Sequence, residues 1–214
     1  MNKALLWDMD GVLADSGDAH FMAWQEMFHE LEREISRQEF DETFGMANTA
    51  ILERWLGAGI QPERSAELAR RKETLFRQHL DRVRILPGVL DWLDYARAQG
   101  HYQVVASSGE MANIVAVVHA LGLGNYFHGI VSGAFLPQSK PHPAVFLQAA
   151  AVVAAEPQHC LVLEDGIVGV EAARRAGMRC IALTTTHAAE RLAGADGIVA
   201  SLADLPPATM DAYL

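Results

Sequence analysis

The feature that most constrains the fold is a regular alternation of helix-like and strand-like segments between residues 89 and 199. Short apolar runs predict buried strands, and the segments between them have helical spacing and end at glycines. Strands separated by helices pair in parallel with right-handed crossovers. The expected fold is α/β, with a doubly wound (Rossmann-like) parallel sheet. The predicted strands are 102–107, 129–132, 160–163, 179–183 and a short one near Ile198, and the predicted helices are 89–99, 110–121, 143–155 and 167–176.

A further apolar run near the start of the chain ends abruptly in two acids, in the stretch Leu5-Leu6-Trp7-Asp8-Met9-Asp10-Gly11-Val12-Leu13. It predicts a buried strand that delivers Asp8 and Asp10, on one side of an extended chain, to the edge where open α/β sheets bind ligands. Asp8 would act there as a nucleophile, and Asp10 as an acid/base that protonates a leaving oxygen and then activates water. The alternative is a polar strand end followed by a glycine turn.

The segment between this strand and residue 102 is several times longer than a crossover requires, and its pattern is helical. Phe21, Trp24, Phe28 and Leu31 have the spacing of one helix face, and further helices are predicted at 50–56 and 62–80. We therefore expect a small inserted all-helical domain at 17–81. The α/β core would then comprise 1–16 and 82–214.

Two serines follow the strand at 102–107, at the edge that Asp8 is expected to reach. Ser107 ends this strand, and Ser108 and Gly109 lead into the next helix. The Ser107 hydroxyl and the first free N–H groups of that helix would face an anion. Taken alone, Ser107 is better explained as a helix cap.

A lysine and an acid pair complete the set of polar groups at strand ends. Pro141 favours an extended conformation for Lys140, and Glu164 and Asp165 follow an apolar strand as Asp8 follows the first one. Taken alone, Lys140 could be a solvated loop residue and Asp165 a helix N-cap. The order of these groups at successive strand ends favours a common site.

Four acids at one edge, Asp8, Asp10, Glu164 and Asp165, would repel one another and any phosphate group. Such a site requires a cation in addition to Lys140. Mg²⁺ fits best, since it prefers oxygen ligands, commonly uses only one or two carboxylates and completes its shell with water and phosphate oxygens. The His and Cys spacing of zinc sites is absent from the sequence.

Composition excludes several classes of partner. Against 27 acids stand 17 Lys and Arg, giving a formal net charge of −10 without a basic block, which disfavours nucleic acid and anionic membranes. Apolar runs are too short to span a bilayer, and an acid at position 8 does not fit a secretory signal, so a cytoplasmic location is expected. Cys160 and Cys180 lie in apolar runs and predict buried thiols without a disulfide.

Together these motifs resemble the four signature motifs of the haloacid dehalogenase superfamily. The resemblance implies that Asp8 becomes an aspartyl-phosphate and that Asp10 is the general acid/base. It implies that Ser107 and Lys140 bind the phosphoryl group, with Ser108 beside them. It also implies that Mg²⁺ is held by Asp8, Asp165 and the backbone carbonyl of Asp10, with Glu164 as an auxiliary contact.

The helical insertion resembles the cap domain of capped phosphatases and β-phosphoglucomutases in that superfamily. His20, Trp24 and Lys72 resemble cap positions that face the substrate. Trp24 fits core packing equally well, and Lys72 fits a solvated helix face. His20 precedes the apolar stripe, close to the start of the insertion.

The expected function is a Mg²⁺-dependent phosphatase acting on a small phosphorylated metabolite, such as a sugar phosphate. A β-phosphoglucomutase-like phosphosugar mutase is the alternative. Against it, Asn48 stands where the mutases usually carry an arginine, and Glu110 follows Gly109 where they carry a Ser-Lys pair. A phospho-accepting receiver module does not fit, since receivers place the acceptor on a middle strand and lack an inserted domain. The acidic surface is compatible with a monomer.

Overall fold

The computed structural model describes residues 1–214, except for the side chain of Phe135. Contacts divide the chain into two compact units. The core unit comprises Met1–Asp15 and Arg84–Leu214, and the helical unit comprises Ser16–Val83, where the sequence predicted 17–81.

The core unit contains a six-stranded parallel sheet in the order β5-β4-β1-β6-β7-β8. Chain order runs outward from β1 through β4 to β5, and then restarts beside β1 with β6. The point where the strand order reverses therefore lies between β1 and β6, and such switch points are where open α/β sheets bind ligands. The predicted doubly wound parallel sheet is confirmed. The strands are β1 (Ala4–Trp7), β4 (Tyr102–Ser107), β5 (Gly129–Ser132), β6 (Cys160–Glu164), β7 (Arg179–Leu183) and β8 (Gly197–Val199).

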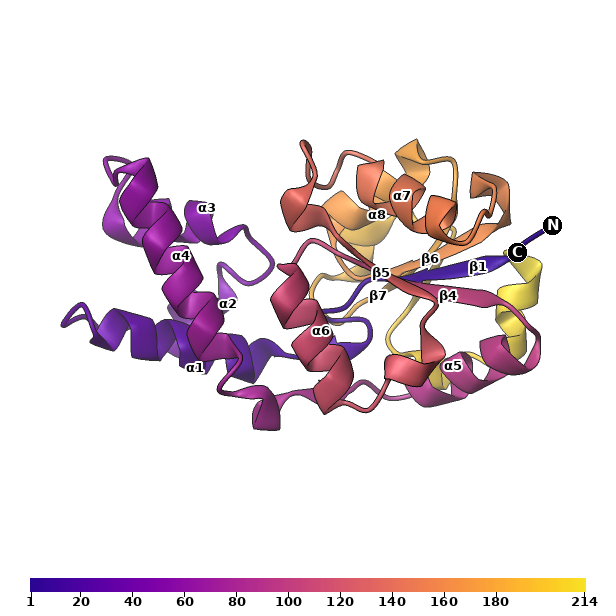
Figure 1. Cartoon of the computed structure of the whole chain (residues 1–214), viewed down its shortest axis with the longest axis horizontal. Helices are drawn as coiled ribbons and strands as arrows, with labels where there is room; N and C mark the ends of the chain where they lie inside the picture. Colours follow the sequence, from indigo (N-terminus) through magenta and orange to yellow (C-terminus); the bar gives the residue numbers. More distant parts are fainter. The chain divides into compact units, whose positions relative to one another are not determined.

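Helices cover both faces of the sheet, with α7 and α8 on one face and α5 and α6 on the other (Figure 1). Beneath α7, Leu6 and Val104 pack with Phe146 in one apolar cluster. On the other face, the indole of Trp7 donates a hydrogen bond to Gln103, whose amide donates to the carbonyl of Leu93 in α5. Helix bounds fall within three residues of those predicted, at α5 (Val89–Ala98), α6 (Met111–Ala120), α7 (Ala144–Val152) and α8 (Ile167–Arg175).

The helical unit is built from α1 (Gly17–His29), α2 (Arg37–Asp41), α3 (Asn48–Leu56) and α4 (Pro62–Phe76), followed by the 3₁₀ helix η1 (Leu80–Arg82). Its core is aromatic, with Trp24 and Phe28 in edge-on contact with the Trp55 ring. The sequence analysis missed α2, although Ser36 and Glu39 form a capping box there and the Ser-x-x-Glu spacing is visible in the sequence.

A short antiparallel ribbon of β2 (Ala14–Asp15) and β3 (Arg84–Ile85) was also missed. Two-residue strands carry no periodic signal, so only the pairing reveals them. The ribbon joins the two chain segments between which the helical unit is inserted.

Short 3₁₀ helices connect the remaining elements of the core unit. The last of them, η7 (Pro207–Ala212), packs on α5, where the Tyr95 hydroxyl donates to Asp211 at 2.7 Å. Among the described residues, none of the helices combines the length and apolar character needed to cross a bilayer. The remaining 3₁₀ helices of the core unit are η2 (Gly124–Tyr126), η3 (Gly133–Phe135), η4 (Pro157–His159), η5 (Ala189–Leu192) and η6 (Leu202–Asp204).

Candidate active site

Asp8 lies directly after β1, at the carboxyl edge of the sheet. Its backbone N–H donates to the carbonyl of Leu163 on β6 at 3.0 Å, and the residue is only 8% exposed. The strand does not extend to Asp10 as predicted, because the chain turns at Met9, and Asp10 instead forms an isolated bridge with Ala14. The acids are thus presented by a turn rather than by one side of an extended strand.

Lys140 is buried among the acids. Its ammonium group donates to Asp8 Oδ1 and to Glu164 Oε1, the latter at 2.6 Å, and its side chain is 5% exposed. The alternative of a solvated loop lysine is therefore wrong. Burial alone would lower the pKa of Lys140, but the charges of Asp8 and Glu164 outweigh it and raise that pKa. The ammonium group stays charged in the site.

The acids perturb one another strongly. Burial raises the pKa of Asp8 well above its usual value, Lys140 opposes the rise, and the charges of Glu164 and Asp165 add to it. Burial, followed by the charge of Glu164, raises the pKa of Asp165 to about 7, with a smaller contribution from Asp10. These mutual effects require the four carboxylates to lie within electrostatic range of one another. The edge holds more negative charge than one lysine neutralises.

Glu164 is the last residue of β6 and is fully engaged by hydrogen bonds. Its Oε2 accepts the N–H groups of Asp165 at 2.9 Å and Gly166 at 2.8 Å, while Oε1 accepts from Lys140. The alternative role of Asp165 as the N-cap of α8 is wrong, because the N-cap residue is Gly166 and no side chain caps this helix. The Asp165 carboxylate is thus left for another role.

Ser107 ends β4, beside the strand that carries Asp8. Its Oγ accepts the N–H of Gly109 at 3.1 Å, so it orders the turn that follows β4 and does not cap α6, whose N-cap residue is Glu110. Ser132 at the end of β5, which the sequence analysis did not single out, donates to the Gly109 carbonyl at 2.6 Å. Ser108 is exposed on this turn.

Two threonines after β7 belong to the same edge and were missed. Thr185 Oγ1 donates to the carbonyl of Gly11 at 2.6 Å, and Thr186 Oγ1 donates to Asp165 Oδ2. The available signal in the sequence is a run of three hydroxyl residues, Thr184-Thr185-Thr186, directly after a predicted strand.

The three residues predicted to face a substrate in the helical unit lie together. The Lys72 ammonium group is hydrogen-bonded to His20 Nδ1 at 2.7 Å, lies 3.0 Å from Glu73 Oε1 and stands 5.4 Å from the centre of the Trp24 ring. Lys72 is 2% exposed, so the alternative of a solvated helix face is wrong. Asn48 donates to the same Glu73 oxygen. Trp24 itself is 1% exposed and belongs to the aromatic core.

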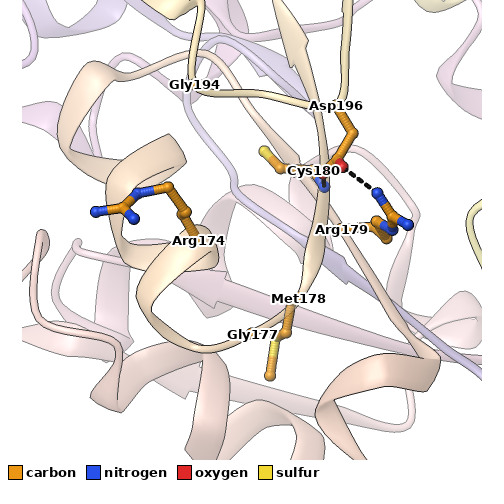
Figure 2. Close-up of a pocket in the computed structure, with 7 residues that line it drawn as sticks. All are labelled: Arg174, Gly177, Met178, Arg179, Cys180, Gly194 and Asp196. Atoms are coloured by element: carbon orange, nitrogen blue, oxygen red, sulfur yellow. Dashed lines mark hydrogen bonds and ion pairs between the residues drawn. The ribbon is translucent and has the colours of Figure 1, made fainter.

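A cavity elsewhere in the core unit is lined by none of the residues predicted to form the active site. It lies at the amino-terminal end of β7, beside the end of α8 (Figure 2). Its two arginines are already paired, Arg179 with Asp196 and Arg174 with Glu171. The cavity therefore offers no unneutralised cation, and the carboxyl edge remains the candidate active site.

The donor set at that edge fits Mg²⁺. Asp8 and Asp165 supply hard oxygen ligands, and Gly11 makes room for them, since a Cβ on Gly11 would lie 1.9 Å from Asp165 Oδ2. Among the described residues, no three His, Cys, Asp or Glu side chains are arranged to hold an ion by themselves. One or two carboxylates with water and phosphate oxygens are the usual Mg²⁺ shell, so the set is sufficient.

Several known proteins are similar in sequence to this chain over most of its length. Protein CbbY of Rhodobacter capsulatus is 31% identical, over 84% of this chain and 84% of that protein. Hexitol phosphatase B of Escherichia coli K12 is 30% identical, over 94% and 93%. The Arabidopsis thaliana protein SUPPRESSOR OF QUENCHING 1, chloroplastic, is 33% identical over 86% of this chain, which spans only 18% of that longer protein.

Solved structures share the fold along the whole chain. A β-phosphoglucomutase from Clostridium difficile superposes with a TM-score of 0.86 at 25% identity, covering 100% of this chain and 97% of the other. CbbY from Rhodobacter sphaeroides, solved with xylulose-1,5-bisphosphate, gives 0.84 at 27% identity, covering 96% of each chain. A family model for haloacid dehalogenase-like hydrolases matches residues 2–177. Together with the acids, serine and lysine at the carboxyl edge, this match establishes that the chain belongs to the haloacid dehalogenase-like hydrolases.

Proposed function

We propose that this hydrolase is a Mg²⁺-dependent phosphatase that removes the phosphoryl group from a small phosphorylated metabolite, most simply a sugar phosphate. The observation that carries the proposal is the buried Lys140 ammonium group bonded to Asp8. A carboxylate nucleophile and a cation for phosphate oxygens are thereby held at one strand edge. The name of hexitol phosphatase B and the xylulose-1,5-bisphosphate bound in the CbbY structure support this substrate class.

Each step is assigned to a group at the edge. An Asp8 oxygen attacks phosphorus, the ester oxygen leaves, and Asp10 supplies its proton. Asp10 then takes a proton from water, which attacks the aspartyl-phosphate, releases inorganic phosphate and restores Asp8. Lys140 and Ser107 hold the phosphoryl oxygens in position during both steps.

Mg²⁺ would be held by Asp8, Asp165 and the carbonyl of Asp10, and when bound it would offset the negative charge of the acids and the phosphate. Both oxygens of Glu164 already accept hydrogen bonds, Oε1 from Lys140 and Oε2 from the N–H groups of the following turn. We therefore assign Glu164 to holding Lys140 and leave direct metal contact to Asp8, Asp165 and the carbonyl of Asp10.

The helical unit would act as the cap that excludes water and selects the leaving group. His20 and Lys72 are its candidate substrate contacts, because polar side chains inside an otherwise aromatic unit are held there by a specific hydrogen-bond network. Trp24 would shape this region by packing beneath Lys72.

A phosphosugar mutase is the second candidate, favoured by the structural match to β-phosphoglucomutase. It would return the phosphoryl group of Asp8 to another hydroxyl of the sugar instead of to water. The side chain of Asn48 donates to Glu73, and Glu110 lies beyond the Ser107 turn. Neither position supplies the cation that a second phosphate requires. We therefore favour hydrolysis over transfer to a second hydroxyl of the sugar.

³¹P NMR with Mg²⁺ and a panel of phosphomonoesters separates the two functions. The panel includes hexose 1-phosphates with a trace of hexose bisphosphate. Growth of an inorganic phosphate signal, absent in Asp8→Asn, would support a phosphatase. Conversion of a hexose 1-phosphate to the 6-phosphate without free phosphate would identify a mutase. Turnover that persists in Asp8→Asn would overturn both.

A further inference from the structure

The segment after β7 sends two hydroxyl groups to the acids of the candidate active site. Thr186 Oγ1 donates to Asp165 Oδ2, and Thr185 Oγ1 donates to the carbonyl of Gly11 at 2.6 Å and lies 3.4 Å from the same Asp165 oxygen. Both contacts reach the carboxyl edge from the segment that follows β7.

Both hydroxyl groups lie on the same oxygen of Asp165, an arrangement that suits a carboxylate whose other oxygen binds a metal ion. A hydroxyl donor on Oδ2 holds the plane of the Asp165 carboxylate and leaves Oδ1 unengaged by Thr186. Gly11 leaves space for this arrangement, because any side chain there would collide with Oδ2. Outer hydrogen bonds of this kind orient metal-binding carboxylates and affect metal affinity.

The second threonine acts on the turn that follows Asp10. Gly11 lies in this turn with a φ of +78°, and its N–H donates to the carbonyl of Ala14 at 2.8 Å, so its own carbonyl is the group that a partner from another segment can hold. Thr185 provides that hydrogen bond from a segment 174 residues away in the chain. The two hydroxyls thus join the turn that carries Asp10 to the acid that follows β6.

We propose that Thr186 and Thr185 are positioning residues for the metal site, Thr186 by orienting Asp165 and Thr185 by holding the turn at Gly11. The inference rests on the proposed function in one respect, that Asp165 binds a divalent cation. The threonines touch neither the reacting atoms nor the metal in this scheme and act only through their neighbours.

The test is direct binding of Mn²⁺, a paramagnetic substitute for Mg²⁺, measured by the loss of the free-ion EPR signal on titration. Thr186→Val keeps the shape of the side chain and removes the donor, and it should weaken Mn²⁺ binding roughly 10-fold or more. Thr186→Ser keeps the hydroxyl and should bind like the wild type. Thr184→Val is the matched control, since no described hydrogen bond involves that hydroxyl. Thr185→Val should fall between Thr186→Val and the control.

A kinetic readout separates positioning from general damage. In Thr186→Val the Mg²⁺ concentration for half-maximal activity should rise, while kcat at saturating Mg²⁺ recovers and KM for the phosphate ester stays near that of the wild type. A variant that is merely less well folded would lose kcat at every Mg²⁺ concentration. Recovery by Thr186→Ser excludes a purely steric effect.

Asp165→Asn distinguishes failure of the inference from failure of the proposed function. If the wild type and Thr186→Val bind Mn²⁺ equally while Asp165→Asn binds weakly, the role of Thr186 is overturned and the proposed metal site stands. If Asp165→Asn binds as tightly as the wild type, Asp165 holds no cation, and both the inference and the metal assignment are overturned.

Discussion

At the scale of single residues, the site depends on a lysine that compensates buried acids. Lys140 contacts Asp8 and Glu164, and the exposed fractions of the three side chains are 5%, 11% and 3%, respectively. Water therefore screens the charges of these groups only weakly. An ion pair that is buried in this way is weak evidence for stability as a whole, but removing one partner leaves uncompensated charge. The same ammonium group would serve phosphate oxygens in the proposed reaction.

Replacement of Lys140 by alanine should therefore reduce the free energy of unfolding by about 3–5 kcal/mol, because Asp8 and Glu164 lose their cation. Urea unfolding at neutral pH measures the difference. Arg174→Ala is the control, since Arg174 pairs with Glu171 on an exposed helix surface, and such pairs contribute roughly 0–1 kcal/mol. Equal losses in the two variants would contradict the buried role of Lys140.

A second residue prediction concerns Glu73 and the pH dependence of stability. Burial would raise the pKa of Glu73, but Lys72, Asn48 and His20 outweigh it and lower that pKa below the usual 4.5. A lowered folded-state pKa means that ionised Glu73 stabilises the protein above the unfolded pKa and that this contribution is lost as pH falls through the folded pKa.

In thermal unfolding, Glu73→Gln should therefore lower Tm more at about pH 7 than at acid pH, since the wild type progressively loses the same contribution as the pH falls below the unfolded pKa. Glu63→Gln, exposed at the start of the same helix, provides the comparison. A Tm difference for Glu73→Gln that grows toward acid pH would show that the sign is wrong.

At the scale of elements, the sheet presents the candidate catalytic groups at the ends of its strands and in the turns that follow them. β1, β4 and β6 are neighbours in register, so Asp8, Ser107 and Glu164 emerge side by side without any contribution from the helices. Such groups stay in place only where the backbone around them is anchored, and here Ser132 at the end of β5 and Thr185 in the segment after β7 supply hydrogen bonds that anchor it. Backbone conformation at glycine turns is therefore a point of sensitivity in this fold.

Gly88 and Gly122 provide a matched test of that sensitivity. Both have a left-handed backbone, with φ of +82° and +70°, but a Cβ at Gly88 would lie 2.2 Å from the backbone nitrogen of Ala203, whereas nothing lies within 4 Å at Gly122. Gly122→Ala should cost roughly 1–2 kcal/mol from backbone strain alone. Gly88→Ala should cost clearly more by urea unfolding, because backbone atoms of η6 must move. Similar losses would mean that the α5 and η6 contact adapts freely.

At the scale of the whole molecule, the strands that end at the candidate site pack in an apolar cluster of the core unit. Cys160 and Cys180 lie on neighbouring strands in this core, and both are free thiols. Burial raises the pKa of Cys160 to about 11 and raises that of Cys180 still further above its usual value. Neither thiol is a nucleophile in the folded state, because reactivity requires an exposed thiolate.

Labelling of the native protein with a thiol reagent should consequently be slow, and both cysteines should react at the same rate, set by opening of the core unit. Mass spectrometry after timed labelling counts the modified thiols, and labelling in denaturant gives the fast reference. Although Cys180 lines the cavity of Figure 2, the residue is only 2% exposed. Rapid reaction of Cys180 alone would show that this cavity admits the reagent.

The sequence by itself determined the order of the core strands and helices and the identity of the acids, because long apolar runs and helical spacing are local signals. It located Asp8, Ser107, Glu164 and Asp165 for the same reason, since each lies at or just after the end of a strand, and it singled out Lys140 by the proline that follows it. The secondary-structure elements that it missed are too short for periodicity, namely α2 and the β2 and β3 ribbon.

Only the tertiary structure decided what each side chain does. Whether Lys140 is solvated or buried, and whether Asp165 caps a helix, depends on partners that are distant in the chain. The hydroxyls of Thr185 and Thr186 gained a role from the turn at Gly11 and from the acid after β6, neither of which is adjacent in sequence. Burial and hydrogen bonding are set by packing, and packing brings together groups whose separation along the chain carries no signal.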